Sequence, residues 1–422
     1  MNQKKMQPHP LFADAESVAI PIDIYFGAYS VVSQYLAKFS AHLNVLNDFE
    51  WARAFLAVHS GTPTTYGNYR AFVERLLLWS WIYCGKSAIT LTTKEFGEFI
   101  SFNENPPETW IGDAARRRFF FKKGEWGFNE AWRPIDSRKT KAKRRVAQEL
   151  QEKFIPEPRG ISASNAGQLL KICCSFYRFL ILKDIVIGNP AMAARDKLVP
   201  ARKVSIGTGR ELTSEQWGYV IDVAEKMANN DSRYERDLFI IVTIYSMYLR
   251  GAELSGNDYW TPTMGAFTIL QGTWWFEIVG RNNEISRVSV RPDFMPYLVR
   301  YRQSRSLPPL PSHGETTPLL TTLTGRPGLT DRQIRGIIQR VFDNAHAQMK
   351  SDGFDERNRI ALLSASATWL RNTSAASDAP KRNPVQLRKD LRQRDLLVTI
   401  DRFYSGDTED TSNRGHGSKI RS

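Results

Sequence analysis

Four short segments in the second half of the sequence carry side chains whose types could do chemistry. Arg250 is followed three residues later by Glu253, and Arg281 follows a glycine in a stretch typical of a hairpin turn. Arg371 lies among apolar helical positions, and Tyr404 precedes a polar tail. Guanidinium groups can clamp an oxyanion, and a tyrosine hydroxyl can act as a nucleophile. Taken singly, each residue also has an ordinary structural explanation, as a helical ion pair, an exposed turn or a half-buried aromatic.

The composition indicates a folded protein with a polyanionic partner. The 422 residues include 58 Lys and Arg against 44 Asp and Glu, a formal charge of +14, and 42% of them are hydrophobic. This charge favours nucleic acid first and an anionic membrane second, and the length suffices for two or three domains. No run of eighteen apolar residues and no secretory signal is present, so we expect no membrane span. Three Cys give neither a disulfide framework nor a metal pattern, and we expect a reduced, cytoplasmic protein.

The elements that must position these residues are mostly helices. Apolar periodicity predicts helices from about 62 to 81, 91 to 102 and 163 to 183, with Thr92 and Glu95 as a capping box on the second. Residues 1–58 are predicted to form an N-terminal arm, 196–210 a linker, and 405–422 a disordered tail. The second half predicts three short strands and several helices. The strands are Phe267–Leu270, Trp274–Val279 and Ile285–Val290; the helices are at about 295–303, 331–349, 361–376 and 385–397. The fold class is therefore mainly α (α+β), a helical first domain followed by a mostly helical domain with a small antiparallel sheet.

The most basic stretch lies between the predicted helices of the first half. Residues 113–145 contain twelve Lys or Arg against four acids, and aromatic residues are interleaved with them. One interpretation is a solvated face beside a small aromatic core. The other, which we favour, is a contact with the DNA backbone, because clustered cations release counterions from phosphates. The candidate DNA contacts are Arg116, Arg117, Arg118, Lys122, Lys123, Lys143, Arg144 and Arg145.

The order of the four segments resembles the catalytic domain of tyrosine recombinases, the phage-integrase family. The family's Leu-Arg-x-x-Glu-Leu motif is matched from Leu249 to Leu254, and Arg281 takes the place of its hairpin Lys. Its second Arg, in His-x-Leu-Arg-His, corresponds to Arg371, and its nucleophile corresponds to Tyr404. A Gly-His pair stands nine residues before that Tyr in the family.

The resemblance implies a domain organisation and a function. Residues 59–195 correspond to a core-binding domain with a long basic insert at about 106–160, and residues 211–404 to the catalytic domain. The implied function is that of a site-specific recombinase of a mobile genetic element, which cleaves and rejoins double-stranded DNA through a 3′-phosphotyrosine and needs no metal or other cofactor. In the family such proteins work as multimers on DNA, and the C-terminal segment commonly packs on a neighbouring protomer.

Departures from the family pattern leave alternatives open. Thr368 and Asn372 stand where the family has His, and strict spacing from Tyr404 puts Asp395 at the third His position, although a shifted register would put Gln393 there. Arg281 is a poor proton donor because an Arg side chain stays protonated. A catalytically impaired DNA-binding relative that assists partner recombinases is therefore the second hypothesis. A basic structural or RNA-binding protein outside the family is the third.

Overall fold

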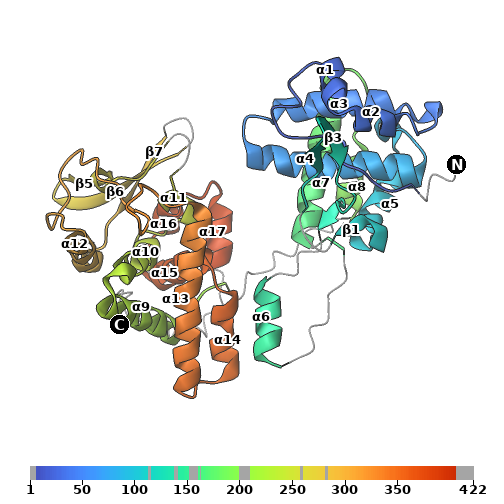
Figure 1. Cartoon of the computed structure of the whole chain (residues 1–422). Coiled ribbons are helices and arrows are strands. Elements are labelled where there is room, and N and C mark those ends of the chain that lie inside the picture. The colour runs from blue at the N-terminus through green and yellow to red at the C-terminus, as the bar shows by residue number, and fades with distance from the viewer. Residues whose placement is uncertain are drawn as a thin grey trace. The chain divides into compact units, whose positions relative to one another are not determined.

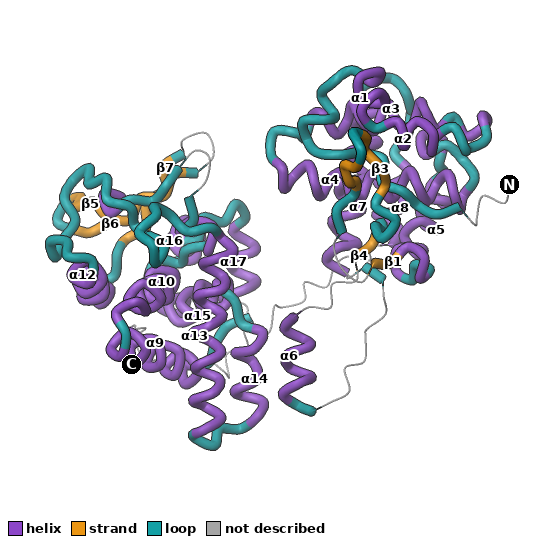
Figure 2. Tube along the Cα trace, viewed as in Figure 1, coloured by secondary structure: helices purple, strands orange, loops and turns teal. Residues whose placement is uncertain are grey.

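The structure is a computed structural model, which describes residues 6–112, 116–136, 141–151, 160–161, 163–198, 210–256, 260–280 and 284–404. The chain is mainly helical, with a few small sheets, as the sequence predicts (Figures 1 and 2). It divides into two compact units, the first formed by Met1–Thr140 and Phe154–Arg202 and the second by Lys141–Lys153 and Lys203–Ser422. Within the described part of the chain, no helix is both long enough and apolar enough to cross a membrane.

Helices form most of the first unit. They are α1 (Ile22–Ala28), α2 (Ser30–Leu36), α3 (Val45–Val58), α4 (Pro63–Trp79), α5 (Thr93–Glu104), α7 (Ala163–Leu182) and α8 (Pro190–Leu198). Strand β1 (Ile111–Gly112) pairs in parallel with β4 (Ile135–Asp136), and β2 (Phe119–Lys122) pairs antiparallel with β3 (Glu125–Phe128). The capping box of Thr92 and Glu95 at the start of α5 is confirmed.

The N-terminal residues are part of this unit's core and not an arm. Leu11 and Phe12 are fully buried, and their backbone N–H groups donate to Glu74 Oε1 at 2.5 and 3.3 Å. Glu74 Oε2 also forms an ion pair with Arg118 of the basic stretch. The arm expected over 1–58 is therefore corrected. One buried carboxylate joins the N-terminus, α4 and the insert, a long-range arrangement that local periodicity does not encode.

Part of the basic insert belongs to the second unit. Helix α6 (Lys141–Glu149) packs on α14 (Glu356–Ser364) in that unit, although the sequence predicts one domain over 59–195. Glu149 accepts a hydrogen bond from Lys350 Nζ at 2.7 Å and another from Arg359, and Arg145 pairs with Asp343. The chain thus leaves the first unit after β4 and returns to it before α7. The charges that hold α6 on the second unit pair with residues about 200 positions away, so the local sequence could not predict this assignment.

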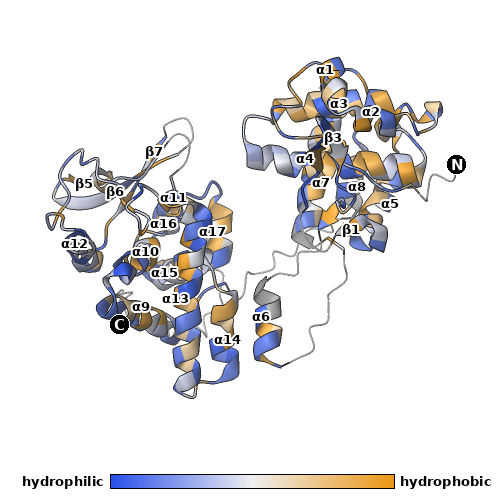
Figure 3. Ribbon diagram, viewed as in Figure 1, coloured by the Kyte–Doolittle hydropathy of each residue, from blue (hydrophilic) through white to orange (hydrophobic). Residues whose placement is uncertain are grey.

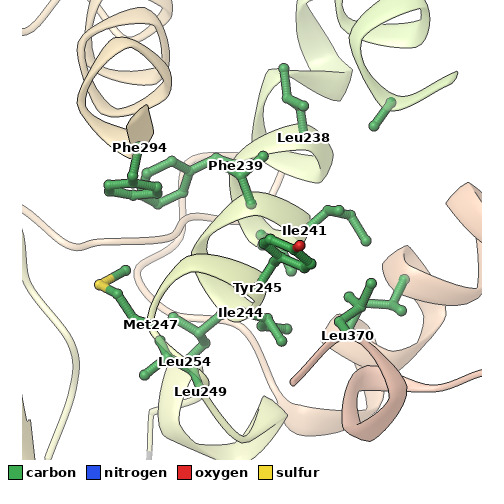
Figure 4. Packing of buried hydrophobic residues seen from close by; sticks show 14 of the residues in the cluster. Leu238, Phe239, Ile241, Ile244, Tyr245, Met247, Leu249, Leu254, Phe294 and Leu370 are labelled. Carbon is green, nitrogen blue, oxygen red and sulfur yellow. The ribbon is translucent and has the colours of Figure 1, made fainter. Parts of the chain in front are cut away.

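The second unit packs its helices around α10 (Glu235–Ser246). The other helices are α9 (Ser214–Asn230), α11 (Gly251–Leu254), α12 (Met295–Ser304), α13 (Asp331–Ser351), α15 (Ala367–Asp378), α16 (Pro384–Asp390) and α17 (Leu396–Phe403). Every residue of α10 from Asp237 to Ser246 is buried, as expected for a helix that is apolar on all sides (Figures 3 and 4). Figure 4 shows Phe239 of this helix beside Phe294, with Leu370 of α15 also in the cluster.

The three predicted strands are present in one antiparallel sheet. They are β5 (Phe267–Leu270), β6 (Thr273–Val279) and β7 (Ile285–Ser289), in the order β5-β6-β7. Two predicted helices differ from the structure. The helix at 361–376 is broken at Ala365 and Ser366, whose backbone is extended, and the helix at 385–397 is broken over 391–395. The second break forms part of the site described next.

Candidate active site

Arg250 is positioned by the sharp end of α10. Tyr248 adopts the left-handed conformation, with φ of 49°, and the Leu249 N–H donates to the Ile244 carbonyl at 3.1 Å. This is a Schellman ending, which glycine usually provides. The Tyr248 side chain is 3% exposed and its hydroxyl donates to Asp378, which holds the unusual residue in place. Fully buried Leu249 then anchors the turn, and Arg250 begins α11 as its N-cap.

Glu253 fixes the Arg250 side chain. Its Oε2 accepts the Arg250 backbone N–H at 2.8 Å, and its Oε1 accepts Arg250 Nη1 at 2.8 Å. Burial alone would raise the pKa of this carboxyl, but Arg392 and Arg250 together lower it below its usual value. The Glu of the recognised motif is therefore an ionised carboxylate that aims the Arg side chain.

Arg371 approaches the same place from α15. It is 6% exposed, and it donates Nη1 to the Tyr248 carbonyl at 3.0 Å and Nη2 to the Leu391 carbonyl. Burial, followed by repulsion from Arg250 and Arg392, lowers the pKa of this guanidinium to about 9. The group is still protonated at neutral pH. The carboxylate of Glu253 offsets part of this repulsion between like charges.

Arg250 and Arg371 converge on one loop. Arg250 Nη2 donates to the Arg392 carbonyl at 3.0 Å and lies 3.4 Å from the Leu391 carbonyl that Arg371 also binds. The Arg250 side chain is 46% exposed, so an anion can reach it from solvent. Two arginines that lie 121 positions apart in the sequence thus form one cationic group.

The loop at 391–395 ends α16 by a second Schellman motif. Arg392 has φ of 50°, its N–H donates to the Lys389 carbonyl, and the Gln393 N–H donates to the Arg388 carbonyl. A left-handed residue followed by Gln393 favours the shifted register, in which Arg392 and Gln393 correspond to the family's Gly-His pair. Gln393 Oε1 accepts the Thr399 hydroxyl at 2.5 Å.

The other substituted positions are Asp395, Thr368 and Asn372. Asp395 is the N-cap of α17, where its Oδ1 accepts the Leu397 N–H at 2.9 Å. Thr368 is exposed on the first turn of α15. Asn372 is buried and donates its side-chain amide to the Arg210 carbonyl at 2.9 Å. Each of the two hydrogen-bonded side chains thus has a local structural role.

Tyr404 follows α17 and is half-buried. Its hydroxyl donates to the Arg382 carbonyl at 2.7 Å, and burial raises its pKa although the charge of Arg382 partly opposes this. Arg382 Nη1 donates to the Tyr248 hydroxyl at 3.2 Å. Tyr404 is therefore linked through Arg382 to the turn that carries Arg250. In this state its hydroxyl is engaged by a backbone carbonyl and not by an arginine side chain.

Arg281 lies outside the described residues. The strands that lead to it are in place, because Val279 of β6 pairs with Ile285 of β7 and the Gly280 N–H donates to the Glu284 carbonyl at 2.7 Å. Among the described residues, no group of three or more His, Cys, Asp or Glu is arranged to hold a metal ion.

The candidate DNA contacts fall into three groups. Arg116, Arg117, Lys122 and Lys123 are exposed in the first unit. Arg118 and Arg145 form ion pairs with Glu74 and Asp343 respectively, and their contact with DNA stays a prediction. The side chains of Lys143 and Arg144 lie outside the described part.

The exposed cations surround a hairpin with a tight turn. Lys123 and Gly124 have φ of 53° and 85°, which suits the two-residue turn between β2 and β3. Phe120 and Phe121 are 44% and 61% exposed beside these lysines. The tip therefore offers both positive charge and apolar rings to a partner.

Solved structures share this fold. The XerH site-specific recombinase bound to its difH substrate, in a pre-cleavage complex, aligns with 12% identity over 97% of this chain and 98% of that chain, at a TM-score of 0.51. The XerH post-cleavage complex with a palindromic difH substrate gives 12% identity, the same coverage and a TM-score of 0.53. No family model and no curated protein matches the sequence. The chain therefore has the fold of the tyrosine recombinases, the class whose motif order its sequence follows.

Proposed function

We propose that this protein is a site-specific DNA recombinase that cuts and rejoins double-stranded DNA through a covalent link to Tyr404. The observation that carries the proposal is the convergence of Arg250 and Arg371 on the loop at 391–392, in a chain with a recombinase fold. The two arginines come from different elements, Arg250 from the N-cap of α11 and Arg371 from α15. A cationic group assembled in this way suits the scissile phosphate.

The reaction follows from these side chains. The Tyr404 oxygen attacks the phosphorus, the bond from phosphorus to the 5′ oxygen breaks, and a 3′-phosphotyrosine forms. The phenol proton passes to solvent or a nearby base, and the departing 5′ oxygen takes up a proton to become a hydroxyl. Negative charge grows on the non-bridging oxygens in the transition state, where the planar forks of Arg250 and Arg371 stabilise it. Rejoining is the reverse reaction with a different 5′ hydroxyl.

Tyr404 must leave its resting contact before it can attack. Its hydroxyl now donates to the Arg382 carbonyl, and burial raises its pKa. Both effects disfavour the phenolate in this state. Attack therefore requires a displacement at the end of α17 that frees the hydroxyl from this carbonyl and presents it to a phosphate held by the two arginines.

The substrate and setting are part of the proposal. Exposed Lys122 and Lys123, with the neighbouring Arg116 and Arg117, would grip the DNA backbone, and XerH is a recombinase solved on its DNA substrate. We propose a mobile genetic element as the origin, the cytoplasm as the place of action, and a multimer on paired sites as the working form.

A second candidate function is that of an accessory DNA-binding relative. Two observations favour it: no His occupies the matched positions, and the Tyr404 hydroxyl rests on a carbonyl. Such a protein would bind the same sites and depend on an active partner for cleavage.

One experiment separates the two functions. A random duplex pool selects the bound sequence, and duplexes nicked at successive positions of that sequence then trap any covalent intermediate. The recombinase gives a protein–DNA adduct that disappears in Tyr404→Phe and persists in Tyr219→Phe, a matched tyrosine of the same unit that bonds Asp352. Specific binding without an adduct at any nick would refute catalysis by this chain and support the accessory function.

A further inference from the structure

We propose that Arg392 is a positioning residue of the phosphate site, which occupies Glu253 so that Arg250 stays available to an anion. The inference rests on the proposed function of the same site. Arg392 stands where the shifted register places the family's glycine, so the motifs did not mark it as a functional residue.

Arg392 makes a dense set of contacts. Its Nε donates to Glu253 Oε1 at 3.0 Å and its Nη2 to Glu253 Oε2 at 2.7 Å, a bidentate fork. The same Nη2 also reaches the Tyr248 carbonyl at 2.7 Å, and Nη1 reaches the Asp390 carbonyl at 2.5 Å. The side chain is only 10% exposed. Arg392 is therefore built into the site and does not itself face an incoming phosphate.

The backbone at Arg392 shows that the side chain matters. With φ of 50°, this position favours glycine, which adopts the left-handed conformation without steric conflict. The contacts of the Arg392 side chain help to offset the cost of this conformation. Those contacts are directed at Glu253 and at the Tyr248 carbonyl, which Arg371 also binds.

The fork determines how Glu253 shares its oxygens. Each oxygen accepts one bond from Arg392 and one from Arg250, of which only the Nη1 bond is from the Arg250 side chain. Without Arg392, Glu253 would have two vacant acceptor sites beside an exposed guanidinium. Arg250 would then turn further onto Glu253 and away from an anion. With Arg392 present, two guanidinium groups bond one carboxylate and the charge of Arg371 lies close to it, so an excess of positive charge remains for a phosphate.

The test uses Arg392→Met, which removes the fork, Arg392→Lys, which restores one charged donor, and Arg392→Gly, which suits the backbone. The matched control is Arg300→Met, because Arg300 of α12 makes a similar bidentate pair with Glu235 of α10. We expect at least tenfold slower adduct formation in Arg392→Met and Arg392→Gly, with partial recovery in Arg392→Lys. Duplex affinity and the control should stay at the wild-type level.

A second substrate separates positioning from a merely structural role. On a duplex with a neutral methylphosphonate at the cleaved position, the non-bridging charge that Arg250 must meet is reduced. On this substrate, the fold decrease in the rate of adduct formation caused by Arg392→Met should be at least threefold smaller than on the natural duplex. An equal loss on both substrates, or wild-type cleavage by Arg392→Met, overturns the inference.

A measurement without catalysis distinguishes this inference from the proposed function. Inorganic phosphate should raise the thermal unfolding midpoint of the wild type, and Arg392→Met should lose most of this rise. If the wild type gives no adduct but the phosphate effect is lost in the variant, the proposed function fails and the positioning role stands. If the wild type shows neither an adduct nor a phosphate effect, both fail.

Discussion

Arg371→Lys is the sharpest test of the assembled site. Arg371 holds the Tyr248 and Leu391 carbonyls with two different nitrogens, and these carbonyls belong to segments far apart in the chain. A lysine keeps the charge but has one nitrogen, which cannot bridge both carbonyls and still face a phosphate. Loss of one transition-state donor slows comparable reactions by about 10²–10³, or about 3–4 kcal/mol. We expect a loss of that size in cleavage, and about 1–3 kcal/mol of lost stability from the carbonyl left unpaired.

Single-turnover cleavage of the nicked duplex measures the first effect, and denaturant unfolding measures the second. Arg302→Lys is the matched control, because Arg302 is 1% exposed in the same unit and its guanidinium binds the Pro308 carbonyl and Glu315. The control should be destabilised similarly and cleave at the wild-type rate once folded. Cleavage by Arg371→Lys within threefold of wild type would refute the assignment of Arg371 to the phosphate.

Three further predictions concern the rest of the chain. Glu74→Gln should lower the unfolding free energy of the first unit by about 3 kcal/mol in denaturant titrations, because it removes the buried carboxylate that pairs with the largely buried guanidinium of Arg118 and accepts two backbone N–H groups; a change below about 1 kcal/mol would contradict this. Lys122→Gln with Lys123→Gln should weaken duplex binding at all sequences and reduce the salt slope by about 2, whereas an unchanged slope would remove the hairpin tip from the DNA contact. Bonds from Lys350 and Arg359 lower the pKa of Glu149 to about 2 from 4.5, so its contribution to docking is full above about pH 4.5 and is lost as pH falls towards 2. Glu149→Gln should therefore speed proteolysis within α6 about fivefold at pH 7, from about 1 kcal/mol of lost pairing, and equal rates would show that the pairing does not hold α6.

The sequence predicted those parts of the site that local chemistry specifies. The spacing from Arg250 to Glu253 indicated a short helical pairing, and the structure has both a backbone and a side-chain bond between them. Short strand-like segments, the last two on either side of a hairpin-turn composition, also predicted the three strands that lead to the hairpin at Arg281. The roles of Arg250, Arg281, Arg371 and Tyr404 in catalysis remain predictions.

The two helix endings that shape the site could not be predicted. Helices usually end this way at glycine, but here Tyr248 and Arg392 take the left-handed positions. Each is stabilised by a partner distant in sequence, Asp378 for Tyr248 and Glu253 for Arg392. A pattern read along the chain therefore continued the helix at 385–397 through the loop. The N-terminal segment escaped prediction for the same reason, because its position depends on Glu74.

Helix α6 has a consequence for the order in which the chain is made. Its partners are synthesised late: Asp343 follows Arg145 by 198 positions, and Arg359 follows Glu149 by 210. At about 5–20 residues per second, a ribosome needs about 10–40 s to reach them. A nine-residue helix is marginal in water without a surface to pack on. During synthesis, the two parts of the first unit are therefore made before and after a segment, Lys141–Lys153, that belongs to the second unit. Helix α6 in that segment becomes stable only when α13 and α14 have been synthesised.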